Sequence, residues 1–499
     1  MVKLLNTPTV KLGIVGVSRN CFPAALTGKR LGVLMKCLAG LGVRAQRCSV
    51  IIETEDHAVA ALAELAQKGC NAAVVYLGNF GPEGPTTLFA QRFPGPVMAC
   101  AAAEEDKQVL AADRGDALCG MLNVGYNLNL RRLRVYVPQA PVGLPAALAP
   151  KIAAFQDIAR VVIGVKNLKI FGFGPRPQDF LACNAPVQPL YDLGVEVMEN
   201  SELDLLQLFR KAAENKARVR RVAGEMAKEL GPSCAYPDLL PKLAQLEVAL
   251  TDFAEANLGA CKYAAFGDKC WPAFEFEFGF APCYVNSRMA GKGIPVACEV
   301  DLYGAMSEYM IQCASQEPAT LLDINNSVPD DVLPPRADLK GATKEDLFMG
   351  FHCGNTCSSC MKTCSLKFQL IMNRLMENGQ APDISRGTLE GQIKPGPTTM
   401  FRLQGTPDCK LRAYIGEGEI LDIDPCSFGA IGIVAVPNFL RFYRHVLIAK
   451  GFPHHGGFGF KKVGKTLFEA VKLLGVEDIG VPLPKSLPYP GENPFELFG

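Results

Sequence analysis

The chain has 499 residues, which is too long for one hydrophobic core, because single cores stop growing at about 250–300 residues. We therefore expect two or three domains. Lys and Arg total 51 while Asp and Glu total 50, so no excess charge is available to neutralise a phosphate backbone or to hold the chain on an anionic membrane. This balance excludes nucleic acids and membrane surfaces as favoured partners.

The first residues, MVKLLNTPTVKLGIVGV, contain no apolar core followed by a small-residue cleavage site. No other apolar stretch reaches the roughly 18 residues that are needed to span a bilayer. The 19 cysteines are an odd number, and many stand singly in apolar segments, where a reduced thiol packs as a small hydrophobe. These features predict a cytoplasmic protein with reduced cysteines.

The N-terminal part alternates strand-like and helix-like patterns. The apolar run LGIVGVS precedes a helical pattern over residues 23–39, SVIIET precedes another over residues 57–68, and NAAVVYLGNF and PVMACAA read as further strands. Alternating strands and helices imply a parallel sheet with helices on both faces and with ligands at the carboxyl ends of its strands. The proline-bearing segment VPQAPVGLPAALAP marks the end of this domain near residue 150.

A second α/β unit follows, with strands predicted at residues 168–174, 194–200 and 294–300 and a long charged helix over residues 202–230. After about residue 385 the pattern changes to short β-rich runs broken by Gly, Pro and Asp, which predict an antiparallel sheet or small barrel. The fold class is therefore α/β, with two Rossmann-like parallel-sheet domains and a β-rich C-terminal domain. The expected boundaries are 1–150, 151–345 and 346–499.

Carboxylates and histidines gather in the C-terminal half. Glu299 ends the apolar run GIPVAC and Asp323 follows the run ATLL, so both carboxylates are expected at the carboxyl ends of buried strands, where α/β active sites lie. A divalent cation would remove the repulsion between them. Taken alone, Glu299 is as well explained by a salt bridge, and Asp323 by a turn or a helix cap.

Four of the five histidines lie in the last third of the chain. His352 stands in the turn FHCGNT, and His454 and His455 stand in FPHHGGFGF, where the glycines let the backbone approach a ligand. Two carboxylates with one or two imidazoles suit Mn²⁺, Mg²⁺ or Co²⁺ better than zinc. His445 lies in an apparent helix, and a structural role is expected for it.

A rival site is the series Cys353, Cys357, Cys360 and Cys364, which could hold an iron–sulfur cluster or zinc. The segment SCMKTCSLKFQLIMNRLMENG reads instead as one amphipathic helix with the cysteines on its buried face. The helix is the preferred interpretation.

Several segments together resemble the L-fucose isomerase and L-arabinose isomerase family, with the fucose isomerase branch closer. They are CWPAFEFEFGFAPCYVNSRMAGKGIPVACEVDLYGAMSEYM, LLDINN, FHCGNT and FPHHGGFGF. The resemblance implies two Rossmann-like domains and a β-rich C-terminal domain, a Mn²⁺ ion and a homotrimer or homohexamer. It also implies that the cysteine-rich segment is a departure from the family.

By motif, the resemblance makes Glu299, Asp323 and His455, or His454 if the pair is read the other way, the metal ligands, with His352 as a further ligand. Glu299 and Asp323 would also be the catalytic acid and base. Three residues would contact the sugar: Arg19 after the first strand, from a neighbouring subunit, together with Asn355 and His454.

The predicted function is a metal-dependent aldose–ketose isomerisation of a free sugar such as L-fucose, D-arabinose or L-arabinose, by proton transfer through an enediol. A non-catalytic sugar-binding or sensor protein on the same fold is the alternative, and it would bind sugar without metal. An iron–sulfur protein is a third reading, and an aldolase is weaker because no lysine stands in a clear Schiff-base setting.

Overall fold

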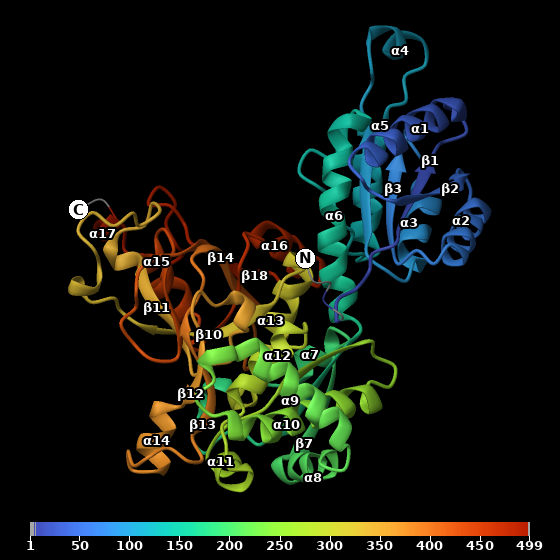
Figure 1. Cartoon of the computed structure of the whole chain (residues 1–499). Helices are drawn as coiled ribbons and strands as arrows, with labels where there is room; N and C mark the ends of the chain where they lie inside the picture. The colour runs from blue at the N-terminus through green and yellow to red at the C-terminus, as the bar shows by residue number, and fades with distance from the viewer. Residues whose placement is uncertain (1–3, 5, 498–499) are drawn as a thin grey trace. The chain divides into compact units, whose positions relative to one another are not determined.

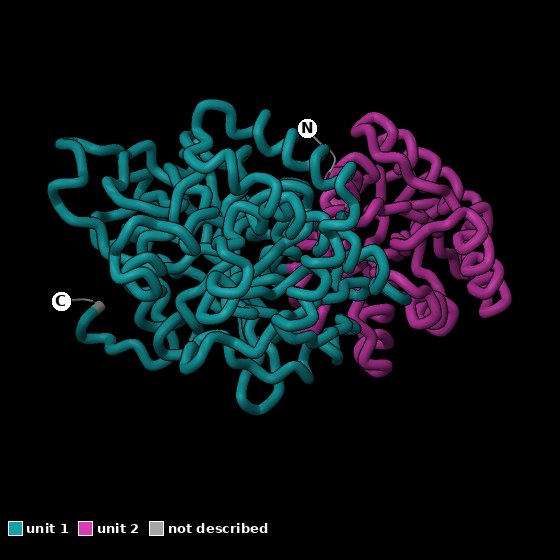
Figure 2. Tube along the Cα trace, turned by 60° about the horizontal axis from the view of Figure 1, so that its bottom comes forward, with its two compact units in different colours: residues 1–7, 164–468, 476–499 teal, residues 8–163, 469–475 magenta. Residues whose placement is uncertain are grey.

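The computed structural model describes residues 4 and 6–497. The chain forms two compact units, one of residues 8–163 with 469–475 and the other of residues 1–7, 164–468 and 476–499 (Figure 2). The boundaries of the three predicted domains stay predictions. Among the described residues, no helix is long and apolar enough to cross a membrane.

The unit of residues 8–163 contains a five-stranded parallel sheet in the order β2-β1-β3-β4-β5. Three of its strands, β1, β2 and β3, are labelled in Figure 1. Its elements are β1 (Leu12–Val17), α1 (Ala24–Gly40), β2 (Ala45–Ile52), α2 (Glu55–Gln67), β3 (Ala72–Leu77), α3 (Glu83–Arg92), β4 (Val97–Ala102), α4 (Lys107–Ala112), α5 (Ala117–Leu130), β5 (Val142–Gly143) and α6 (Pro145–Val165). β1, β3 and β4 are buried along their whole length, as expected of strands covered on both faces.

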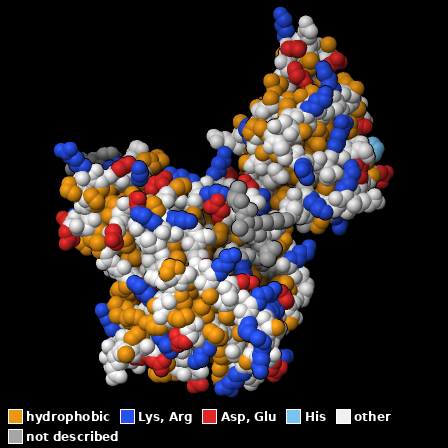
Figure 3. Space-filling view, viewed as in Figure 1, with side chains coloured by type: hydrophobic (Ala, Val, Ile, Leu, Met, Phe, Trp, Pro, Cys, Tyr) orange, Lys and Arg blue, Asp and Glu red, His pale blue; other side chains and the backbone are white. Residues whose placement is uncertain are grey.

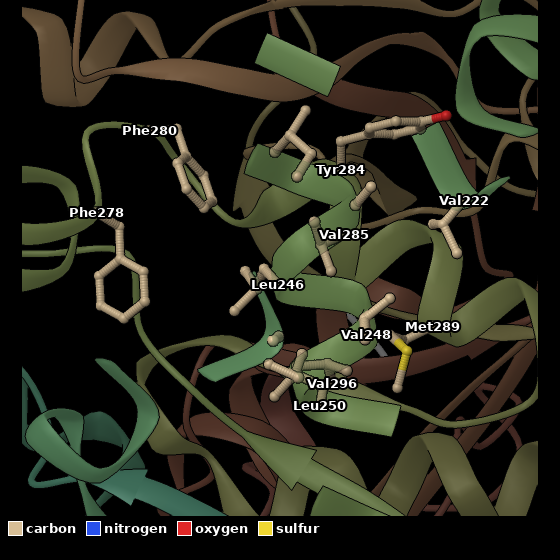
Figure 4. Close-up of a cluster of buried hydrophobic side chains, with 14 of the residues drawn as sticks. Val222, Leu246, Val248, Leu250, Phe278, Phe280, Tyr284, Val285, Met289 and Val296 are labelled. Carbon is tan, nitrogen blue, oxygen red and sulfur yellow. The ribbon is translucent and has the colours of Figure 1, made fainter. Parts of the chain in front are cut away.

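The larger unit contains a second parallel sheet in the order β7-β6-β8-β9. Its elements are β6 (Leu168–Gly174), α7 (Gln188–Asp192), β7 (Glu196–Ser201), α8 (Glu202–Ala212), α9 (Lys216–Leu230), α10 (Leu240–Asn257), β8 (Tyr263–Gly267), α11 (Ala273–Phe278), α12 (Cys283–Gly291), β9 (Val296–Ala297) and α13 (Leu302–Ser315). Side chains of α9, α10, α12 and β9 gather into one apolar cluster beside this sheet (Figure 4).

The same unit carries a nine-stranded, largely antiparallel sheet. Its elements are β10 (Ala319–Asn326), β11 (Leu347–His352), β12 (Ser365–Phe368), α14 (Leu370–Met376), β13 (Arg386–Gln392), β14 (Gly396–Gly405), β15 (Leu411–Ile420), β16 (Ala430–Ala435), α15 (Phe439–Phe442), β17 (His455–Gly459), α16 (Gly464–Leu473), β18 (Asp478–Gly480) and α17 (Pro494–Leu497). β15 also pairs with β16, so β16, β11, β10, β17, β14 and β15 form a closed ring of hydrogen-bonded strands. The predicted fold class is confirmed.

α13 is buried on all sides because it contacts β14 and β17 of the closed ring as well as β8 of the parallel sheet. Glycines in β17 permit the close approach. A Cβ at Gly459 would meet the side chain of Ile311, and one at Gly457 would lie 3.2 Å from the backbone of Glu308. α13 begins three residues after Glu299, so this packing helps to set the position of the predicted carboxylate relative to the closed ring.

Two local predictions are wrong. The charged helix over residues 202–230 is broken into α8 and α9, because the Asn215 side chain caps a new helix by accepting a hydrogen bond from the backbone of Arg218. The cysteine-rich segment is not one helix but a 3₁₀ turn (Ser358–Cys360), the strand β12 and the short helix α14. Pairing of β12 with β13 overrides the local helical pattern.

Candidate metal and active site

Glu299 lies in a 3₁₀ turn, Cys298–Val300, that follows β9 directly. It therefore stands at the carboxyl end of a parallel strand, as the sequence predicts. Glu299 and Val300 both have φ of 55°, and positive φ is strained for a residue with a side chain, above all for a β-branched one. A 2.7 Å hydrogen bond from the Val300 amide to the Asp268 carbonyl helps to hold the turn. Strain maintained in this way is typical of functional sites.

Asp323 reaches the same region from the closed ring. The sequence places it at the end of a buried strand, but it lies inside β10, directly opposite His455 on the antiparallel strand β17. Directly opposed residues in an antiparallel pair hold their side chains close together. The register of this pair, rather than the end of a strand, brings Asp323 to the site.

The Nε2 atom of His455 is the point on which the predicted residues converge. It lies 3.6 Å from Oε2 of Glu299 and 3.5 Å from Oδ1 of Asp323. These two oxygens are buried and accept no hydrogen bond from a described residue. Buried polar atoms are rarely left without a partner. These two oxygens are therefore suited to bind a ligand or a proton that lies between the carboxylates and His455.

Two buried residues that the sequence analysis missed, Asp301 and Arg402, stabilise the orientation of the His455 ring. Oδ2 of Asp301 lies 2.9 Å from Nδ1 of His455, and Arg402 donates to both oxygens of Asp301, at 2.5 and 2.9 Å. Arg402 also donates to Gln404, and Asp301 accepts from the amide of Gly304 at the start of α13. When the His455 ring is neutral, Asp301 keeps its proton on Nδ1, so the Nε2 lone pair can bind a cation, as in the carboxylate–histidine pairs of metal sites.

Burial and neighbouring groups shift the pKa values of Glu299, Asp323 and His455. Burial raises the pKa of Glu299 to about 7, although the His455 charge opposes the shift, and burial raises the pKa of Asp323 to about 6. Burial alone would lower the pKa of His455, but its hydrogen bond with Asp301 raises that pKa well above the ordinary value. Positive charge at Nε2 of His455, from a proton or from a cation, therefore stabilises the arrangement.

His352 is also present, and a hydrogen bond to its ring favours one tautomer. Its Nε2 lies 3.8 Å from Oε2 of Glu299, while its Nδ1 accepts a 2.9 Å hydrogen bond from the Cys353 amide. Burial lowers the pKa of His352 to about 3, so the ring is neutral, and its one proton is on Nε2. In this tautomer the protonated Nε2 faces Glu299, but at 3.8 Å it is too far away for a hydrogen bond. The predicted part of His352 as a metal ligand stays a prediction.

The predicted sugar contacts His454 and Asn355 lie beside these groups in the chain. Nε2 of His454 is 3.8 Å from Oδ1 of Asp323, and its half-exposed ring meets Phe180 edge to face. Asn355 is buried three residues after His352, and neither polar atom of its amide has a hydrogen-bond partner among the described residues. An unpaired buried amide is suited to a ligand hydroxyl.

Arg19 belongs to the other compact unit, where it follows β1. Its guanidinium pairs with Glu83, donates to the Gly81 carbonyl and stacks 4.5 Å above the Phe80 ring. Its predicted contact with the sugar stays a prediction. His445, expected to be structural, stacks on Tyr489 and lies 3.6 Å from Glu492.

The four cysteines of the rival site do not converge. Cys357 and Cys360 are in contact, but no three of the four thiols form a group able to hold a metal ion within the described part of the chain. The three groups of that kind all include His455: one with Glu299 and His352, one with Asp323 and His454, and one with Cys183 and Asp301. Carboxylate oxygens and imidazole nitrogens with unpaired buried oxygens among them fit a hard or borderline divalent cation.

Two protein-family models and several known proteins are similar to this chain. The model of the fucose/sulfoquinovose isomerase N-terminal domain matches residues 13–166, and that of the L-fucose isomerase C-terminal domain matches residues 350–480. The chain is similar to the sulfoquinovose isomerases of Alkalicoccus urumqiensis (24% identical over 336 residues, 66% of this chain and 69% of that protein) and Priestia megaterium (23% over 337 residues, 66% and 68%). A third, from a Clostridium species, is 26% identical over 313 residues, 62% of this chain and 64% of that protein.

Fold, site and family models together define an aldose–ketose isomerase. The chain belongs to the fucose/sulfoquinovose isomerase family. The resemblance noted from the motifs is thereby confirmed.

Proposed function

We propose that this protein is a metal-dependent isomerase that interconverts a free aldose and its ketose at the cluster around His455. The observation that carries the proposal is the convergence of two unpaired, buried carboxylate oxygens on Nε2 of His455, within 3.6 Å. Glu299, Asp323 and His455 are the proposed ligands of a divalent cation, Mn²⁺ with Mg²⁺ or Co²⁺ as substitutes. When bound, such a cation would polarise the sugar carbonyl and stabilise the charge that develops on the sugar oxygens.

Isomerisation moves one proton between C1 and C2 of the sugar and another between their oxygens. Glu299 and Asp323 face His455 from two different elements, the turn after β9 and the strand β10. We assign the proton transfers to these two carboxylates, because each has an unpaired buried oxygen within 3.6 Å of Nε2 of His455 and a carboxylate can both take up and release a proton.

The remaining side chains of the site would bind the sugar. The unpaired amide of Asn355 and the half-exposed ring of His454 are the proposed partners of sugar hydroxyls, with Arg19 contributed by another copy of the chain. The substrates to consider first are L-fucose, D-arabinose, L-arabinose and sulfoquinovose, the last because the named relatives are sulfoquinovose isomerases.

The proposal is tested by removing metal from the purified protein with a chelator and assaying ketose formation from these four aldoses, with and without added Mn²⁺. We expect turnover of at least one aldose with Mn²⁺ and a loss of about 10³-fold or more without it. Calorimetric titration with the same sugars is run in parallel on the metal-free protein. Sugar binding without turnover in either form would establish the sensor alternative instead.

We also propose that the protein is a homo-oligomer and that α5 forms one of its contacts. Four apolar residues at intervals of four are exposed along this helix: Leu118 (65%), Leu122 (72%), Tyr126 (65%) and Leu130 (63%). α5 carries no charged residue, but Asp116 precedes it and Arg131 follows it. Antiparallel pairing of two copies would place each Asp116 beside the other copy's Arg131. Such a two-fold contact occurs in a hexamer with two-fold axes but not in a trimer, so it favours the hexamer.

Leu122→Glu should break this contact by placing two charges at its centre, and light scattering should then show about half the native mass. Leu203→Glu is the matched control, since Leu203 is 69% exposed on α8 and its replacement should leave the mass unchanged. In Figure 3 acidic and basic side chains are interspersed over the face in view. An unchanged mass for Leu122→Glu would contradict the proposed contact.

A further inference from the structure

The sequence C-S-S-C at Cys357–Cys360 forms a tight turn in which the two thiols touch. The Cys360 amide donates a 2.8 Å hydrogen bond to the Cys357 carbonyl, so the turn closes on itself. The two sulfur atoms lie 3.1 Å apart. Both residues are buried, with 3% and 8% of their surfaces exposed. The isomerase site uses neither thiol.

Each of the two cysteines nevertheless lines a cleft at the surface of the larger unit. Cys357 lines a cleft of about 400 Å³ together with Arg288, Lys292 and Glu317. Cys360 lines a neighbouring cleft of about 350 Å³ together with Lys394 and Glu317. A small molecule bound in either cleft would therefore lie beside one of the two cysteines.

The two thiols are not equivalent. The Ser359 hydroxyl lies 3.2 Å from the Cys357 sulfur but 4.0 Å from the Cys360 sulfur. The close contact of the two sulfurs, together with the Ser359 hydroxyl, lowers the pKa of Cys357, and the same contact raises the pKa of Cys360. Cys357 is the better nucleophile, since the thiolate is the reactive form.

We propose that Cys357 and Cys360 are a redox-active dithiol that reduces small organic disulfides and closes into an intramolecular disulfide. The Cys357 thiolate attacks one sulfur of a disulfide RSSR, which forms a mixed disulfide and releases RS⁻. The Cys360 sulfur, after giving up its proton, then attacks the Cys357 sulfur and displaces the second RS⁻. The two cysteines lose two electrons and two protons, and RSSR becomes two RSH.

The surroundings of the turn suit this exchange. Closure brings the sulfurs from 3.1 Å to about 2.05 Å, a small movement. The turn itself is held from both sides: the Lys394 amide donates to the Cys360 carbonyl at 2.9 Å, and the Ser358 hydroxyl donates to Glu229 at 2.6 Å. Just before it, Thr356 and Thr320 share a 2.9 Å hydrogen bond between their buried hydroxyls, which anchors the turn to β10. Reduced and oxidised forms can therefore share one fold.

The test exposes the reduced, folded, full-length protein to bis(2-hydroxyethyl) disulfide. The reaction is stopped with acid, free thiols are alkylated under denaturing conditions, and the mass of the tryptic fragment of residues 345–362 is measured by mass spectrometry. This fragment contains Cys353, Cys357 and Cys360. We expect it to lose two hydrogens and to carry one alkyl group, on Cys353, at a rate at least about tenfold above that of the exposed Cys409 and Cys426.

Single variants separate the two roles. Cys360→Ser should accumulate a mixed disulfide on Cys357, whereas Cys357→Ser should leave Cys360 largely unmodified over the same time. Unfolding the protein in denaturant should abolish the difference in reaction rate between Cys357 and Cys360 and the exposed cysteines. A fragment that keeps three alkylated cysteines after Cys409 and Cys426 have reacted, or equal modification of the two single variants, would overturn the proposal. None of these measurements depends on the isomerase activity.

Discussion

Glu299→Gln should lower turnover by about a thousandfold or more and weaken metal binding, with little effect on folding. The amide keeps the shape of the side chain but loses the charge, and it cannot take up the proton that isomerisation transfers. Because Oε2 of Glu299 is buried without a hydrogen-bond partner, no stabilising contact within the protein is lost. The measurement is a ketose assay at saturating Mn²⁺ beside a thermal melt.

The matched control is Glu277→Gln, which makes the same change at an exposed position of α11 and should leave both turnover and melting temperature unaltered. Asp323→Asn should resemble Glu299→Gln, since Oδ1 of Asp323 is also buried and unpaired. If Glu299→Gln retained native turnover, the assignment of the proton transfer to Glu299 would be wrong.

Arg402→Met should destabilise the protein by about 3–5 kcal/mol and weaken metal binding by about 10- to 100-fold. Arg402 is completely buried and holds both oxygens of Asp301. Its removal leaves a buried carboxylate with only His455 and a backbone amide as partners. The charge of Asp301 is then less well compensated, and Asp301, which orients His455, is held less firmly. Denaturant unfolding gives the first quantity and titration with Mn²⁺ gives the second.

The control is Arg412→Met on the neighbouring strand β15. Arg412 is about a quarter exposed and faces Asp478 at 3.9 Å, so its ion pair should contribute less than about 1 kcal/mol. Equal destabilisation by the two substitutions would show that the buried Asp301–Arg402 pair contributes no more to stability than the partly exposed pair of Arg412. Lost stability with unchanged metal affinity would show that Arg402 does not act through His455.

Local patterns in the sequence predicted much of this protein. Apolar runs followed by helical periodicity predicted both parallel sheets, and the short β-rich runs after residue 385 predicted the antiparallel sheet. Glu299 could be identified as a candidate because a carboxylate directly after a buried strand is a local feature, and His455 because two histidines precede glycines. The recognised motifs identified the family, which the family models confirm.

Other parts of the site depend on residues that are distant in the sequence. Asp301 and Arg402 are separated by 101 positions, and neither local segment predicts its contact with the other. The lone arginine within the β-rich run TTMFRLQG did, however, indicate a buried partner. Asp323 reaches His455 through strand register, and the cysteine-rich segment pairs as a strand against β13 although its own periodicity favours a helix.

The sequence by itself determined the kinds of element, the family and the residues able to carry the chemistry, because side-chain periodicity and motif spacing are properties of neighbouring residues. Only the tertiary structure decided which oxygen faces which nitrogen. The closed ring of strands and the packing of α13 against β17 set the site, and they place His455 between two carboxylates with Asp301 and Arg402 behind it. Strand register and burial depend on pairings across the whole chain, which no local pattern specifies.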